Sequence, residues 1–79
     1  MKRAYNYVNP EDVTACKELI RTMIKRDKKR HGSKYRLDES DAQEYAYQAA
    51  KFFDVMQYDF RIDIEEWALE EIKKVEAKC

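Results

Sequence analysis

Residues 38–56, DESDAQEYAYQAAKFFDVM, decide the fold of this 79-residue chain. Apolar side chains recur here at the 3.6-residue spacing of a helix, so they form one continuous stripe. The stripe comprises Ala42, Tyr45, Ala46, Ala49, Phe52, Phe53 and Met56. Its alanines allow a neighbouring helix to approach closely at one end, and we expect the two phenylalanines to fill the other end. With Asp38 or Ser40 as the cap, we predict a central helix over about residues 39–57.

A second helix is predicted before this stretch, over about residues 10–31. Asn9 can cap it, Pro10 suits its first position, and Gly32 can end it. Its apolar face comprises Val13, Cys16, Leu19, Ile20, Met23 and Ile24. No apolar residue occurs from Lys25 to His31, so we expect the end of this helix to extend beyond the core as a polar tail.

A third helix is predicted over about residues 63–78. Asp63 and Glu66 have the spacing of a capping box, and Ile62 is placed to pack against Trp67. The inner face comprises Ile64, Ala68, Ile72, Val75 and Cys79. Residues 1–8 show no helical period and are predicted to be an extended arm. With one glycine and one proline in the whole sequence, the chain is predicted to be a single all-α domain, a small three-helix bundle with a short extended N-terminal arm.

Several classes of function are not supported by the sequence. His31 is the only histidine, no glycine-rich loop is present, and no nucleophile lies near His31 in the sequence. The carboxylates around Arg61 lack the glycine of a calcium loop. We therefore expect no enzyme activity, no cofactor and no metal. The two cysteines are outside any CxxC pattern and no apolar run is long enough for a membrane span, so we expect a cytoplasmic protein.

Charge is sorted along the chain, although the net charge is zero. Residues 17–36 carry nine Lys and Arg against two acids, a net of +7. The candidate contacts for nucleic acid or an acidic partner are Lys25, Lys28, Lys29, Arg30, Lys34, Tyr35 and Arg36. Basic side chains displace counterions from phosphates, and a tyrosine can stack on a base. The alternative is a solvated helix end, where cations are favoured by the helix dipole.

Residues 37–71 carry eleven acids against two bases, a net of −9. The candidate acidic surface comprises Asp38, Glu39, Asp41, Asp63, Glu65 and Glu66. Such a surface could imitate nucleic acid and occupy a basic groove of another protein. The alternative is that these acids favour the starts of helices, again through the dipole.

A third candidate surface lies opposite the apolar stripe of the central helix. One narrow arc of that helix is predicted to carry Tyr47, Lys51, Asp54 and Tyr58, with Val55 beside it. Tyrosine is enriched at protein interfaces, and the chain has six. The alternative is that the N-terminal arm covers this arc with Tyr5, Tyr7 and Val8.

We therefore predict a small protein-binding module, such as an inhibitor or an adaptor. In its size and its tyrosine-rich, mixed-charge composition the chain resembles phage or mobile-element proteins that block host machinery, including the anti-CRISPR group, although it shares no motif with them. The alternatives are nucleic-acid binding through residues 25–36 and a structural subunit of a larger assembly. Homo-oligomerisation is also expected, because a chain of this length buries little surface alone.

Overall fold

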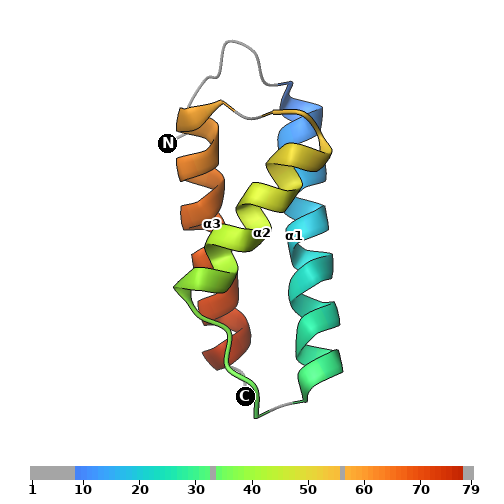
Figure 1. Ribbon diagram of the computed structural model, residues 1–79, viewed down its shortest axis with the longest axis vertical. Coiled ribbons are helices and arrows are strands. Elements are labelled where there is room, and N and C mark those ends of the chain that lie inside the picture. Colours follow the sequence, from blue (N-terminus) through green and yellow to red (C-terminus); the bar gives the residue numbers. More distant parts are fainter. Residues whose placement is uncertain (1–8, 33, 56, 78–79) are drawn as a thin grey trace.

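The computed structural model describes residues 9–32, 34–55 and 57–77. They form three helices: α1 (Pro10–His31), α2 (Glu39–Phe52) and α3 (Tyr58–Ala77). α1 and α3 run in the same direction along the long axis of the molecule, and α2 runs back diagonally across them (Figure 1). Over these stretches there is no strand, and none of the three helices is long and apolar enough to cross a membrane. The prediction of a small all-α three-helix bundle is confirmed, whereas the predicted arm, residues 1–8, lies outside the described residues.

The alanine-rich face of α2 forms the centre of the bundle. α2 packs against α1 and α3 more extensively than these two pack against each other. Its buried residues are Ala42, Tyr45, Ala46, Ala49 and Ala50. Because four of these five side chains are single methyl groups, the neighbouring helices come close to the α2 backbone. The Sγ of Cys16 in α1, for example, lies 3.7 Å from the carbonyl oxygen of Ala49.

α1 and α3 complete the core with aliphatic and aromatic side chains. The buried residues are Cys16, Ile20, Met23 and Ile24 in α1 and Phe60, Ile64, Ala68 and Ile72 in α3. Among the described residues no polar or charged residue is buried. Asp27, which interrupts the apolar face of α1, accepts a hydrogen bond of 2.6 Å at Oδ2 from the hydroxyl of Tyr45. This bond lowers the pKa of Asp27, while burial and then the Asp27 bond raise the pKa of Tyr45.

The boundary between α2 and α3 differs from the prediction. α2 ends at Phe52 instead of near residue 57, and α3 begins at Tyr58 instead of near residue 63. Phe52, predicted to fill one end of the core, is 73% exposed. Phe53 is only partly buried against the core, and Met56 lies outside the described residues.

A tight turn with its own hydrogen bonds causes this early end of α2. Asp54 adopts a positive φ of 56°. The N–H of Val55 donates to the carbonyl of Ala50 (2.8 Å), and the N–H of Asp54 donates to the carbonyl of Lys51 (3.2 Å). These two bonds form a Schellman motif, in which the residue after the left-handed position commonly packs against the helix. Val55 does so and is 7% exposed.

The predicted capping box at the start of the third helix is wrong. Asp63 and Glu66 lie inside α3, so their backbone N–H groups are not those of a helix start. A capping box is present instead at the start of α2, which begins where the sequence predicted. The Asp38 carboxylate accepts from the N–H of Ser40 (3.0 Å) and Asp41 (3.4 Å), and the Asp41 carboxylate accepts from the N–H of Asp38 (2.9 Å). At the start of α1, by contrast, the side chain of Asn9 makes no capping hydrogen bond.

The connection between α1 and α2 folds back against the end of α3. α1 ends at Gly32, which has the positive φ of 88° that glycine tolerates best. Leu37 then enters the core, and its N–H donates to Oε2 of Glu76 at 2.6 Å. The other oxygen of Glu76 accepts from Lys28 at 3.0 Å and from Arg36 at 3.3 Å. The end of α1 is therefore not simply a polar tail that extends beyond the core, as the sequence predicted, because Lys28 is largely covered.

Candidate protein-binding surface

Tyr47 lies on the outer face of α2, whereas its sequence neighbours Tyr45, Ala46 and Ala49 are buried. Its ring is 39% exposed. Two cations flank the ring: Lys51, one turn later in α2, lies 6.0 Å from its centroid, and the guanidinium of Arg61 in α3 lies 5.5 Å from it. The cation–π contact to Arg61 joins α2 to α3 at the surface.

The first two turns of α3 add two apolar side chains to this region. Tyr58, Arg61 and Ile62 have the i, i+3, i+4 spacing that places residues on one face of a helix. Tyr58 is 72% exposed, and Ile62 is also exposed. We define the tyrosine patch as Tyr47, Lys51, Tyr58, Arg61 and Ile62. The described part of the chain has five exposed large hydrophobic residues, and three of them, Tyr47, Tyr58 and Ile62, belong to this patch.

Two predicted members of this surface have other roles. Val55 is buried and cannot contact a partner, because it packs beneath the α2–α3 turn. Asp54 is exposed but lies outside α2, at the left-handed position of that turn. The single helical arc that the sequence predicted therefore does not exist, and Tyr58 joins Tyr47 and Lys51 only through the packing of α3 against α2.

Arg61 and Ile62 were not among the surface residues predicted from the sequence. Their i, i+3, i+4 relation to Tyr58 would have identified them if the third helix had been started at residue 58. Beneath the patch, the structure also leaves Oε1 of Gln57 and Nε of Arg61 buried without a hydrogen bond among the described residues. Buried polar atoms without a partner are few in native proteins, so this position has unused hydrogen-bonding capacity.

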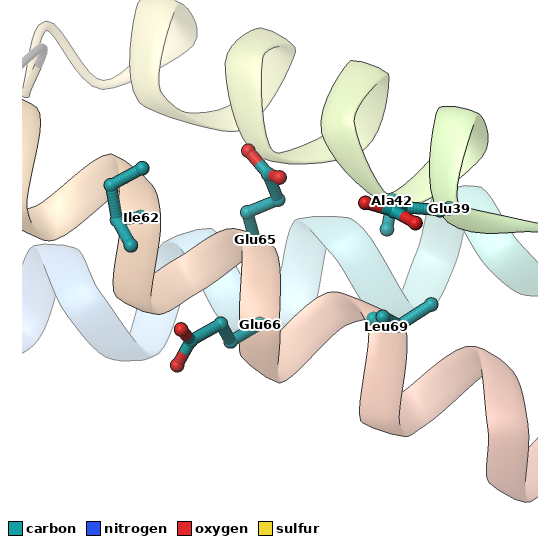
Figure 2. Close-up of a pocket in the computed structure, with 6 residues that line it drawn as sticks. All are labelled: Glu39, Ala42, Ile62, Glu65, Glu66 and Leu69. Carbon is teal, nitrogen blue, oxygen red and sulfur yellow. The ribbon is translucent and has the colours of Figure 1, made fainter.

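A groove lies between α2 and α3 and shares Ile62 with the tyrosine patch (Figure 2). Its volume is about 220 Å³, and it is lined by Glu39, Ala42, Ile62, Glu65, Glu66 and Leu69. Glu65 projects from α3 toward α2, with Ile62 and Leu69 on either side of it along α3 (Figure 2). Ile62 belongs to both the patch and the groove, so the two form one continuous surface on the α2–α3 side of the molecule.

The structure separates the six residues of the predicted acidic surface. Asp38 and Asp41 are engaged in the capping box of α2. Asp63 is partly buried within α3. Only Glu39, Glu65 and Glu66 come together, and they do so on the lining of the groove.

The structure also divides the predicted basic segment. Lys28 and Arg36 bind the carboxylate of Glu76. The ring of Tyr35 stacks on His31, with 4.4 Å between the ring centroids. The remaining four candidates, Lys25, Lys29, Arg30 and Lys34, are exposed.

The thiol of Cys16 has a raised pKa. Burial, and then the charge of Asp12, raise the pKa of the Cys16 thiol to about 11, so the thiol is protonated at neutral pH and a poor nucleophile. His31 contacts Tyr35 rather than a nucleophile. Within residues 9–32, 34–55 and 57–77, no three His, Cys, Asp or Glu side chains are placed to hold a metal ion.

No protein-family model, curated protein or solved structure matches this chain. The proposed function therefore rests on the tyrosine patch.

Proposed function

We propose that the protein is a small protein-binding module that contacts its partner through the tyrosine patch, acting as an inhibitor or an adaptor. The exposure of Tyr58 carries the proposal. A side chain that is 72% exposed contributes little to the core, and Arg61 and Ile62 lie one turn further along the same face of α3. Tyrosine and arginine are the residue types enriched in the energetically dominant part of interfaces.

The contacts within the patch support this proposal. Arg61 is held over the ring of Tyr47, so its orientation is fixed before a partner binds, and less conformational entropy is lost on binding. A cytoplasmic location is consistent with the free thiol of Cys16.

The test is photo-crosslinking in cells that express the full chain. A photoreactive phenylalanine analogue at position 58 should crosslink to a defined partner, and a crosslinker at exposed Thr14 on α1 should not. The double variant Tyr47→Ser, Tyr58→Ser should lose the partner. The matched control is Tyr35→Ser, because Tyr35 is exposed to the same 39% as Tyr47 but lies outside the patch. Equal crosslinking from positions 58 and 14, or equal loss in the control, would contradict the proposal.

A second candidate is nucleic-acid binding at the end of α1. Lys25, Lys29, Arg30 and Lys34 are exposed and make no ion pair with the described residues. Four phosphate contacts would give a slope of roughly −4 in log affinity against log salt for duplex DNA. Titration of labelled duplex at several salt concentrations tests this, since binding through tyrosines would depend much less on salt.

A further inference from the structure

The groove between α2 and α3 has an aliphatic lining with carboxylates around it. Ile62, Leu69 and Ala42 supply the apolar part, and Glu39, Glu65 and Glu66 supply the charges (Figure 2). Lysine and arginine side chains have the complementary construction, because they bury an aliphatic stem while the charged head stays at the surface. A groove of about 220 Å³ therefore suits basic side chains better than a purely apolar segment.

The three carboxylates of the groove lack the ion-pair partners that three other glutamates, all in α3, have. Glu70, Glu71 and Glu76 each form an ion pair of 3.5 Å or less. Glu39, Glu65 and Glu66 form none with the part of the chain that the structure describes. Three like charges on one groove repel one another, so a bound cation would relieve this repulsion.

The complementary surface is present on the same chain. Lys29, Arg30 and Lys34, at the end of α1 and in the loop that follows it, are exposed and make no ion pair among the described residues. This end of α1 is the lower end of the molecule in Figure 1. Within the described residues, each copy thus presents basic side chains at the end of α1 and carboxylates on the groove that form no ion pair, and the chain as a whole has no net charge.

We propose that the groove binds the basic end of α1 from a second copy of this chain. Lys29, Arg30 and Lys34 of one copy contact Glu39, Glu65 and Glu66 of the other, with their stems against Ile62 and Leu69. Reciprocal contact around a two-fold axis would satisfy both surfaces of both copies and close the assembly as a dimer. This contact goes beyond the proposed function, because its charged residues lie outside the tyrosine patch and only Ile62 belongs to both surfaces.

The test is analytical ultracentrifugation of the full chain with two charge-reversal variants. One variant, Glu65→Lys with Glu66→Lys, reverses the groove, and the other, Lys29→Glu with Arg30→Glu, reverses the basic end. The wild-type chain should associate at low salt and dissociate at high salt, because the contact is electrostatic. Each variant alone should associate about tenfold or more weakly, and an equimolar mixture of the two should recover most of the association.

The control variant is Glu18→Lys with Glu44→Lys, which makes the same change in net charge at exposed sites outside the groove. Its association should stay within about twofold of the wild type. Circular dichroism of every variant establishes that it is folded, and Glu65→Gln with Glu66→Gln provides a milder replacement if the reversal unfolds the chain.

A wild-type chain that stays monomeric at low salt would overturn the proposal. The proposal would also be overturned if the mixture did not recover self-association, or if the control variant associated as weakly as the groove variant. A monomer that uses the groove to bind a different, basic protein would overturn it as well. If self-association is intact but no partner depends on Tyr47 and Tyr58, this inference stands and the proposed function is contradicted instead.

Discussion

The two edges of α3 use charge in different ways. On the edge that faces α1, charged side chains are engaged with other elements: Arg21 binds Glu71 at 3.2 Å, and Lys28 binds Glu76 at 3.0 Å. On the edge that faces α2, Glu65 and Glu66 line a groove and have no ion pair among the described residues. The charges on the edge that faces α1 therefore hold the fold together. Glu65 and Glu66 make no such contact with the described residues and are available to a partner.

Removal of the Glu76 carboxylate is expected to have the largest effect on stability. Glu76→Ala eliminates the acceptor for the N–H of Leu37 and leaves the largely covered ammonium of Lys28 without its carboxylate. Leaving a covered charge unpaired is strongly destabilising, so this variant should show the largest fall in melting temperature among the acidic residues of α3. Thermal unfolding followed by circular dichroism at neutral pH measures it. The control is Glu70→Ala, since Glu70 is exposed and pairs with Lys73. An equal fall in the melting temperature of the two variants would contradict the special role of Glu76.

Acid should weaken the same edge. Hydrogen bonds from Leu37 and then Lys28 lower the pKa of Glu76 below its ordinary value of 4.5. Burial raises the pKa of Glu71, but Lys74 and Arg21 outweigh it, so the net pKa is also lowered. A carboxylate whose pKa is lower in the folded state stabilises the fold fully above the unfolded-state pKa, and this contribution is lost as the pH falls through the folded-state pKa. Stability should therefore decline below about pH 4.5.

Urea unfolding across this pH range measures the decline. In Glu76→Gln the decline should be smaller, because the group that titrates is gone. An unchanged acid profile in this variant would show that Glu76 does not carry the effect.

Glu71→Gln should have a smaller effect. The amide keeps the shape of the side chain but weakens the bonds to Arg21 and Lys74, at a cost of about 1 kcal/mol. Arg21 also lies over the ring of Trp67, 5.1 Å from its centroid, so it retains one contact with α3. Urea unfolding at neutral pH gives the difference, and a loss as large as that of Glu76→Ala would be the contrary result.

The smallest effect is expected on the other edge. Glu65→Gln with Glu66→Gln should change the free energy of unfolding by less than about 0.5 kcal/mol, as for surface substitutions that touch no structural feature. The same unfolding measurement applies. A loss of more than about 1 kcal/mol would mean that these carboxylates support the fold, and the contrast between the two edges would fail.

Local patterns in the sequence were sufficient for the fold class and for most of the core. The stripe that includes Ala42, Ala46 and Ala49 is buried along α2 as predicted. The end of α2 was not predicted, because helix ends are commonly recognised by glycine or proline. Here the left-handed position is occupied by Asp54, and the hydrogen bonds of Val55 and Asp54 to the preceding turn make the end.

The candidate surface was only partly predictable for a related reason. Tyr47, Lys51 and Tyr58 were identified from their residue types, but they were placed on one helix, and the true neighbours Arg61 and Ile62 were missed. Long-range contacts such as that between Lys28 and Glu76 have no local signal, because they depend on how the ends of two helices meet. This is why two of the basic candidates proved to be part of the fold.

Trp67, the one tryptophan of the sequence, lies in α3 beside Lys17 and Arg21 of α1, with its centroid 5.5 and 5.1 Å from their charged groups. Its fluorescence thus reports on a single helix pair without any added label. Far-ultraviolet circular dichroism follows the helices themselves, so the two signals together can show whether α1 leaves α3 before the helices melt or at the same moment.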